Sequence, residues 1–143
     1  MFGVHVNTHV ASSTFQNCTS DLSGGAMWVS HFVVSYPSAS VLSTMIVEGC
    51  TFEGNAAPKG GAFAVATKSS VTIQSSQFKN NTASQEGGAL DVDTESSVTV
   101  QDSLFTDNTA TGSGRGGAIM MAVNAGKEGE PAQAARKSDF RAS

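Results

Sequence analysis

Short segments in which apolar and polar residues alternate recur along residues 1–123, and turns rich in Gly, Asn and Ser separate them. Residues 63–66 align in this pattern with 90–93 and 119–122, and residues 71–74 align with 98–101. A period of two is typical of strands that have one buried and one solvated face. Since a helical period is found nowhere in residues 1–123, the pattern predicts an all-β domain there.

The turns carry a repeat of their own. Each of four blocks places a Phe ahead of a Gly-Gly-Ala turn, and three of the blocks also have Asn three residues after the Phe. The repeated residues are Phe15, Phe52, Phe78 and Phe105; Asn55, Asn81 and Asn108; and the pairs Gly24 and Gly25, Gly60 and Gly61, Gly87 and Gly88, and Gly116 and Gly117. The Phe spacings are 37, 26 and 27 residues, so the first interval contains an insertion, which we place at residues 30–44.

A repeat of two or three short strands predicts a solenoid. Parallel strands need a long crossover, and a coil that walks once around a cross-section supplies it. We therefore predict a right-handed parallel β-helix of about four coils over residues 1–123, with neighbouring coils about 4.8 Å apart. Equivalent positions then stack in interior columns. The predicted columns are Met27, Phe63, Leu90 and Ile119; Val29, Val65, Val92 and Met121; Val10, Val47, Ile73 and Val100; and the four Phe residues.

The corner residues of the repeat have structural explanations. Asn tolerates left-handed backbone geometry, and stacked Asn amides bond unpaired backbone groups and one another along the axis. The Gly pairs suit a corner with positive φ or close backbone packing. None of these residues requires a ligand. Cys18 and Cys50 fall at different corners, too far apart for a disulfide, so two unpaired and mostly buried thiols are expected.

Three blocks pair Phe-x-x-Asn with Gly-Gly-Ala, at Phe52 and Asn55, Phe78 and Asn81, and Phe105 and Asn108. This pairing resembles the repeat of the chlamydial polymorphic outer membrane proteins, over residues 10–123. The resemblance implies a pectin-lyase-like β-helix and an adhesive passenger domain that is extracellular or displayed on the cell surface, associated with the outer membrane in a bacterium. Cys18 departs from the family pattern where the first block would have Asn, and neither a translocator barrel nor a signal peptide is visible.

Composition then limits the classes of function. Charged residues make up 14% of the chain, the net charge is −4, and Lys and Arg do not cluster, which argues against nucleic-acid binding. No apolar run approaches the roughly 20 residues of a membrane span. Residues 124–143 are polar, break the repeat, and are expected to form a flexible tail. Neither this tail nor residues 4–10 offers a clear cap for the strand edges, which favours a fragment of a longer chain with further coils.

Two carboxylates are the candidates for catalysis. Asp91 and Asp93 lie on the outward face of one expected strand, about 7 Å apart, within the range that inverting glycosidases use. On the same strand position, the neighbouring coils place Ala64, Ala66, Met120 and Ala122 beside them, with no basic or amide side chain. A working site needs convergent polar partners. A solvated polar face is therefore the favoured interpretation, and a carbohydrate-active site is the alternative.

A second candidate site is the insertion at residues 30–44. It carries His31, Phe32 and Tyr36, and Trp28 precedes it at an outward position. Aromatic residues on a protrusion form contact surfaces for sugars or proteins. The favoured alternative is a local flap folded over the outer face.

No metal or other cofactor is expected, because His5 and His9 lie about 13 Å apart along one strand and are too distant to share a metal. Asn17 and Asn80 each begin an N-glycosylation sequon at an exposed turn. These features predict a structural or adhesive module of an extracellular or surface protein, with a host or matrix protein or a glycan as partner. The alternative is a fragment of a polysaccharide lyase or hydrolase.

Overall fold

The computed structural model describes residues 5–30, 42–66, 68–94, 96–112, 116–121 and 140–142, and the elements it places there are all strands. In chain order they are β1 (His5–Ala11), β2 (Thr14–Gln16), β3 (Met27–Val29), β4 (Leu42–Glu48), β5 (Thr51–Glu53), β6 (Ala56–Lys59), β7 (Phe63–Val65), β8 (Ser69–Gln74), β9 (Gln77–Lys79), β10 (Thr82–Glu86), β11 (Leu90–Val92), β12 (Ser97–Gln101), β13 (Ser103–Thr106), β14 (Thr109–Ala110), β15 (Ile119–Met121) and β16 (Phe140–Ala142).

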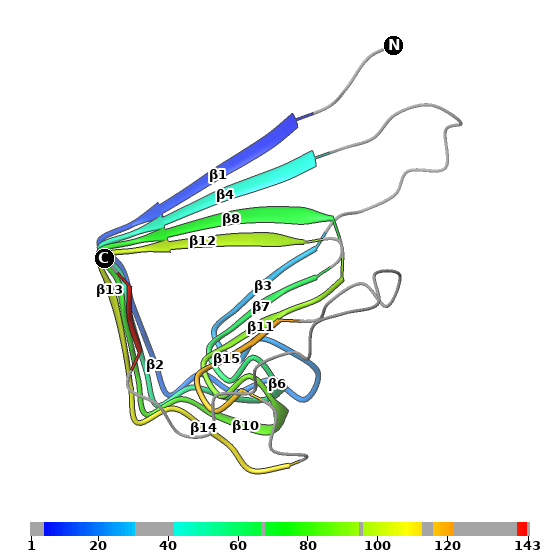
Figure 1. Cartoon of the computed structure of the whole chain (residues 1–143), viewed down its shortest axis with the longest axis vertical. Helices are drawn as coiled ribbons and strands as arrows, with labels where there is room; N and C mark the ends of the chain where they lie inside the picture. Colours follow the sequence, from blue (N-terminus) through cyan, green and yellow to red (C-terminus); the bar gives the residue numbers. More distant parts are fainter. Residues whose placement is uncertain are drawn as a thin grey trace.

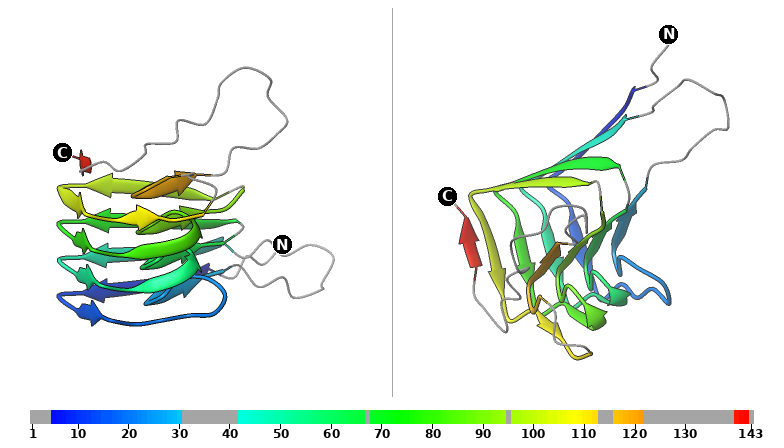
Figure 2. Two further views of the ribbon diagram at one scale, coloured as in Figure 1. Left: turned by 90° about the horizontal axis from the view of Figure 1, so that it is seen from below. Right: turned by 45° about the vertical axis from the view of Figure 1, so that its right-hand side comes forward.

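The strands build four sheets around one cross-section, and the chain visits them in a fixed order (Figure 1). Sheet A has the order β1-β4-β8-β12, sheet B β16-β13-β9-β5-β2, sheet C β14-β10-β6 and sheet D β15-β11-β7-β3. Apart from β16, every strand pair in these sheets is parallel. Figure 2 shows the result as four stacked coils. The fold is the predicted right-handed parallel β-helix.

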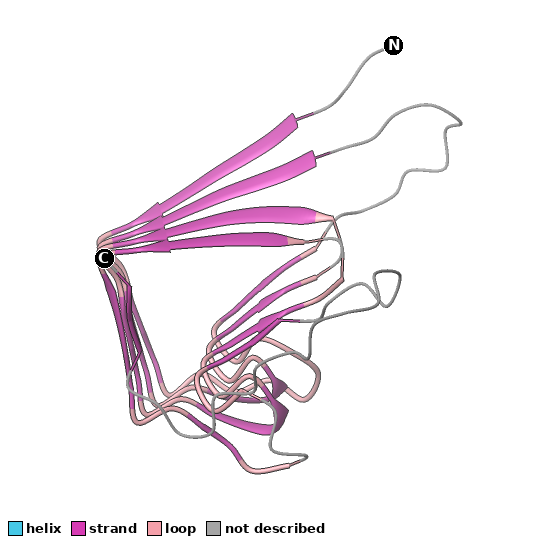
Figure 3. Cartoon of the chain, in the orientation of Figure 1, coloured by secondary structure: helices cyan, strands magenta, loops and turns pink. Residues whose placement is uncertain are grey.

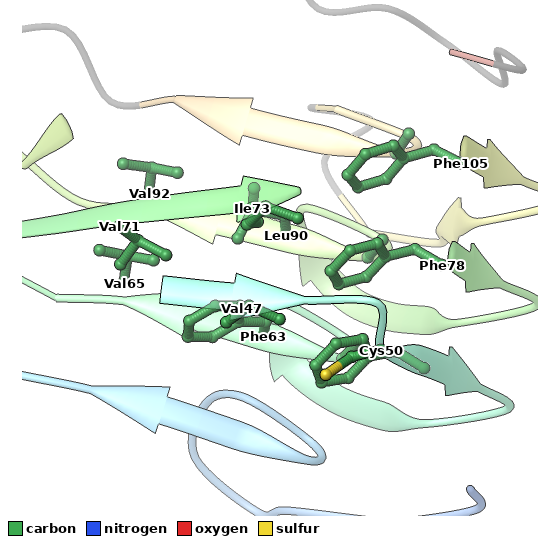
Figure 4. Packing of buried hydrophobic residues seen from close by; sticks show 14 of the residues in the cluster. Val47, Cys50, Phe63, Val65, Val71, Ile73, Phe78, Leu90, Val92 and Phe105 are labelled. Carbon is green, nitrogen blue, oxygen red and sulfur yellow. The ribbon is translucent and has the colours of Figure 1, made fainter. Parts of the chain in front are cut away.

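The strand registers confirm the predicted columns, but Met121, predicted to lie inside at the end of the second column, is 49% exposed. Phe63 pairs with Met27 and Leu90, and Leu90 pairs with Ile119. Val47 pairs in the same way with Val10 and Ile73. Figure 4 shows Phe63, Leu90, Val47 and Ile73 among the side chains packed between the sheets. Like residues stack because each coil repeats the backbone path of the coil before it.

The four repeated Phe residues form a continuous aromatic stack along one corner. Ring centroids of successive members lie 4.9, 4.6 and 4.6 Å apart, with interplanar angles of 10° or less. This spacing equals the distance between paired strands, so the register of sheet B imposes the stack. Phe52, Phe78 and Phe105 are fully buried, whereas Phe15 in the first coil is partly exposed.

The predicted amide ladder is present at the corner between sheets B and C. The side-chain amide of Asn55 donates to Asn81 Oδ1 at 3.0 Å, and that of Asn81 donates to Asn108 Oδ1 at 2.9 Å. The same oxygens accept the backbone N–H of Asn55 and Asn81. Asn81 Nδ2 also donates to the carbonyl of Phe52. Each buried Asn therefore satisfies backbone groups that the corner removes from strand pairing.

A second ladder, at the corner between sheets A and B, was not predicted. The backbone N–H of Cys50 donates to Ser76 Oγ, and that of Ser76 donates to Ser103 Oγ, both at 3.1 Å. The Ser76 hydroxyl donates to the Gln74 carbonyl, and the Cys50 thiol donates in the equivalent way to the Glu48 carbonyl, at 3.3 Å. Both cysteines are unpaired, as expected, with Cys50 buried and Cys18 partly exposed.

The residues with left-handed backbone conformation at the Asn corner are not the ones expected. Positive φ was assigned to Asn55, Asn81 and Asn108, but it belongs to the residue before each of them. Those residues are Gly54, Asn80 and Asp107, and Asn17 is their equivalent in the first coil. The ladder Asn must place its amide inward, so the reversal of the backbone falls on its exposed neighbour.

The Gly pairs form the corner between sheets C and D, and the two residues of each pair meet different requirements, positive φ and close backbone packing, as predicted. The first Gly of each pair has positive φ, for example 62° at Gly87. The second has no room for a side chain, because a Cβ on Gly88 would overlap the Gly117 carbonyl of the next coil. This corner turns the chain back on itself between β10 and β11 (Figure 1).

The end of the chain returns to the coils. Phe140–Ala142 form β16, which pairs antiparallel with β13 and places Phe140 opposite Phe105. Figure 3 shows the trace without helices among the described strands. Residues 124–139 of the expected tail (124–143) lie outside the described residues, and so do residues 31–41 of the expected insertion (30–44).

The hydrogen bonds of the amide ladder should contribute strongly to the free energy of unfolding. Asn81→Ala is expected to lower the free energy of unfolding by about 3 to 5 kcal/mol, because it leaves several buried donors and acceptors unpaired. Chemical denaturation followed by circular dichroism measures this change. Asn80→Gly is the control, since Gly54 holds the equivalent turn, and should change stability by less than about 1 kcal/mol. Equal losses in the two variants would contradict the assignment.

Candidate functional site

The outward face of sheet D carries one continuous column of non-repeating side chains. Register aligns Trp28 with Ala64, Ala64 with Asp91, and Asp91 with Met120. Trp28 is 61% exposed, as the alternation predicted, whereas Asp91 is half-buried. Ala64 between them is buried although it faces outward, so larger neighbours cover it. The face therefore combines an open aromatic ring with a partly shielded carboxyl group.

The Gly-Gly corner adds charged residues that the sequence analysis did not name. Lys59 and Glu86 are the last residues of β6 and β10, each directly before a Gly pair, and they are partners across sheet C. Lys59 Nζ lies 3.5 Å from Glu86 Oε2. Because the Gly pair reverses the chain, this ion pair lies within electrostatic reach of Asp91 on the strand that follows.

The surroundings of Asp91 change its acidity. Burial raises the pKa of the Asp91 carboxyl from 3.8 to about 6. The Lys59 ammonium lowers the pKa in opposition, while Glu86 and Asp93 raise it further. Burial dominates because a charged carboxylate loses hydration that one lysine does not replace. Asp91 thus exchanges its proton near neutral pH.

Asp93 has a different environment. It is exposed, and its Oδ1 accepts the backbone N–H of Thr94 at 2.7 Å. This bond stabilises the turn after β11, so the Asp93 carboxylate has a structural role in that turn.

The second carboxylate on the far side of the Gly-Gly corner that affects Asp91 electrostatically is Glu86. The neighbouring coils place no basic side chain at the same strand position, where Asp91 pairs with Ala64 and Met120. The positive charge that acts on Asp91 comes instead from Lys59 of β6.

The family comparison agrees with this geometry. Residues 1–125 match the protein family described as the right handed beta helix region. The chain belongs to the right-handed β-helix family. Comparisons with curated proteins and with solved structures gave no match. The β-helix family fixes the fold of the chain but names neither a ligand nor a reaction.

The other candidate residues of this β-helix divide into two groups. His31, Phe32 and Tyr36 lie outside the described residues, so the structure tests neither the contact surface nor the flap. Asn17 and Asn80 are exposed and have positive φ, at equivalent turns two coils apart.

The part of the β-helix that the structure describes contains no group of three or more His, Cys, Asp or Glu side chains arranged for a metal ion. Within the same residues, no helix has the length and apolar character needed to cross a membrane.

A signal for Lys59 and Glu86 was present in the sequence. Both directly precede a Gly pair, as Ser23 does in the first coil. The repeat alignment relates residues on the same strand of neighbouring coils. The charges that act on Asp91 of β11 come instead from the ends of β6 and β10, before the Gly-Gly turn. Gly in this position permits the sharp reversal that brings the two sheets' residues together.

Asp91 should make stability depend on pH. The folded pKa of about 6 exceeds the unfolded value, so the carboxyl destabilises the fold as pH rises from about 4 to above 6. Asp91→Asn removes this penalty. We expect the variant to exceed the natural chain in unfolding free energy by about 1 to 2 kcal/mol at pH 8, after allowing for solvent screening, and by much less at pH 4.

Denaturation at both pH values measures the difference, and a ¹³C carboxyl titration reads the pKa of Asp91 directly. Asp21→Asn, at an exposed position of the first coil, is the control for losing a carboxylate outside sheet D. A stability gain from Asp91→Asn that is the same at pH 4 and pH 8 would contradict the proposed burial of the charge.

Proposed function

We propose that this β-helix is an adhesive, carbohydrate-binding module of a surface-exposed or secreted protein. The observation that carries the proposal is the exposed ring of Trp28 on the outer face of sheet D, in one column with Asp91. A Trp that is mostly solvated gains little for the fold, whereas its face offers a large rigid contact area to a sugar ring. The resemblance of the repeat to surface adhesins supports the location.

The polar groups near Trp28 suit sugar hydroxyl groups. Asp91 lies two strands from Trp28, a separation of about 10 Å that a disaccharide unit spans. Asp91 and Glu86 provide acceptors, and Lys59 provides a donor at the same corner. Such a combination of one apolar platform and a few fixed polar groups is typical of ligand sites.

Binding is favoured over turnover because the described site offers a platform and a proton-holding carboxyl, with the second outward carboxylate, Asp93, engaged by its own turn. One observation does favour a carbohydrate-active enzyme as the second candidate. The pKa of the Asp91 carboxyl is raised to about 6, and the Glu86 carboxylate contributes to that shift, so Asp91 could act as an acid in mildly acidic solution.

Trp28→Ala should weaken glycan binding. Losing one stacked aromatic contact is expected to reduce affinity about tenfold or more. A glycan array followed by calorimetry on the positive sugars measures the loss. Leu22→Ala is the matched control, because Leu22 is 81% exposed in the same coil but lies outside sheet D.

Two results would contradict the proposal. One is an array without reproducible binding to any glycan. The other is equal loss of affinity in the Leu22→Ala and Trp28→Ala variants. Steady release of reducing ends or unsaturated sugars by the natural chain, abolished in Asp91→Asn, would support the enzymatic candidate instead.

A further inference from the structure

The turn between sheets B and C presents two Asn side chains to solvent. Asn17 and Asn80 hold the same position of this turn in two coils, and Gly54 and Asp107 hold it in the other two. All four residues have positive φ, between 52° and 66°. Asn adopts this conformation more readily than most residues. Because Gly and Asp serve the same turn, its geometry permits Asn without requiring it, and the two exposed Asn call for another explanation.

Each of these Asn is followed two residues later by Thr. The two segments read Asn17-Cys18-Thr19 and Asn80-Asn81-Thr82. Thr19 and Thr82 are exposed, as the two Asn are, while the middle residue holds the inward ladder position. The alternation of the chain therefore puts both residues that define an N-glycosylation sequon on the outside of the coil.

The fold uses the backbone of the turn and not the outward amide. The backbone N–H of Asn17 donates to the Glu53 carbonyl at 3.0 Å, and that of Asn80 donates to the Thr106 carbonyl at 3.1 Å. A substituent on the exposed side-chain nitrogen of Asn80 leaves these hydrogen bonds in place. The buried Asn of the ladder are the opposite case, because their side-chain nitrogens donate to backbone carbonyls and to the next ladder amide.

The spacing of the two exposed Asn leaves room for a bulky group on each. They lie two coils apart, a separation of about 10 Å. Gly54 stands between them, and a Cβ built there would lie 2.6 Å from Asn17 Oδ1. With Gly at this position, no side chain of the intervening turn occupies the space beside Asn17.

We propose that Asn17 and Asn80 are acceptor sites for N-linked oligosaccharides. In the transfer, the side-chain nitrogen of the Asn attacks C1 of the first sugar of a polyprenyl-diphosphate-linked oligosaccharide. An N–C1 bond forms, the bond from C1 to the diphosphate oxygen breaks, polyprenyl diphosphate leaves, and the nitrogen gives up one proton. The inference rests on the secreted or surface location in the proposed function, but not on the sugar-binding face, which lies on sheet D.

Secretion from a eukaryotic cell tests the assignment. The full chain, placed behind a cleavable secretion leader, is produced in yeast, and its intact mass is measured before and after peptide-N-glycosidase treatment. Treatment in ¹⁸O water converts each formerly occupied Asn into labelled Asp, so peptide mass spectrometry locates the sites. We expect both Asn17 and Asn80 to be occupied, and the β circular dichroism to be the same before and after removal of the glycans. Chain that the cells retain is assayed in the same way from microsomes.

Variants at the third coil separate the sequon from its surroundings. Asn80→Gly keeps the turn, since Gly54 has the same conformation, and should lose one glycan. Thr82→Ala should lose the same glycan although Asn80 is unchanged, and Thr82→Ser should keep it. Adding Asp107→Asn to Asn80→Gly should restore one glycan, because Thr109 already follows at the required distance.

A matched control places a sequon on a buried ladder residue. Ala110→Ser completes the pattern Asn-Thr-Ser that begins at Asn108. The Asn108 side-chain nitrogen donates to the Phe78 carbonyl at 2.9 Å inside the coil. Secreted, folded chains of this variant should therefore carry no glycan at Asn108.

Three results would overturn the proposal. They are unmodified Asn17 and Asn80 in chains that have passed through the secretory compartment, no glycan gained from Asp107→Asn, and a glycan at Asn108 in folded Ala110→Ser chains. If only one of the two Asn is unmodified, its own assignment is overturned. Trp28→Ala should leave both glycans in place, so the failure of the sugar-binding proposal and the failure of this one give different results.

Discussion

The buried amide ladder is the interaction on which the rest of this structure depends. Each coil of a solenoid contacts only the coil on either side of it. At each corner, backbone N–H and C=O groups that have no partner in the sheets must therefore find hydrogen bonds elsewhere. Asn55, Asn81 and Asn108 do this at the corner between sheets B and C, through backbone and side-chain hydrogen bonds in every described coil step. The ladder fixes the register, and the register in turn stacks the Phe rings at 4.6 to 4.9 Å.

Because ladders and columns of side chains fill the interior, the proposed recognition of a glycan is placed on an outward face. The outer face of sheet D differs from the rest in carrying an exposed aromatic ring and a half-buried carboxyl group in one column. The Gly-Gly corner affects the electrostatics of this face as well as the folding of the coil. By reversing the chain it brings the charges of Lys59 and Glu86 to Asp91, and these charges act with burial to set its acidity.

The same regularity that builds the coils also creates a hazard. Identical steps make the first and last coils complementary, and unprotected edges of that kind promote association. At one such edge, β16 pairs antiparallel with β13.

The sequence by itself determined the coil count, the interior columns, the Asn ladder and the unpaired thiols, because stacking is a one-dimensional rule that alignment of the repeat reveals. Tertiary structure decided the rest. The meeting of Lys59 and Glu86 with Asp91 depends on how a Gly-Gly corner folds back, and the left-handed residue falls one place before each ladder Asn because only that amide points inward. The pairing of residues 140–142 with β13 could not be predicted from the repeat. This strand is antiparallel and far from β13 in the chain, so no repeated sequence pattern marks it.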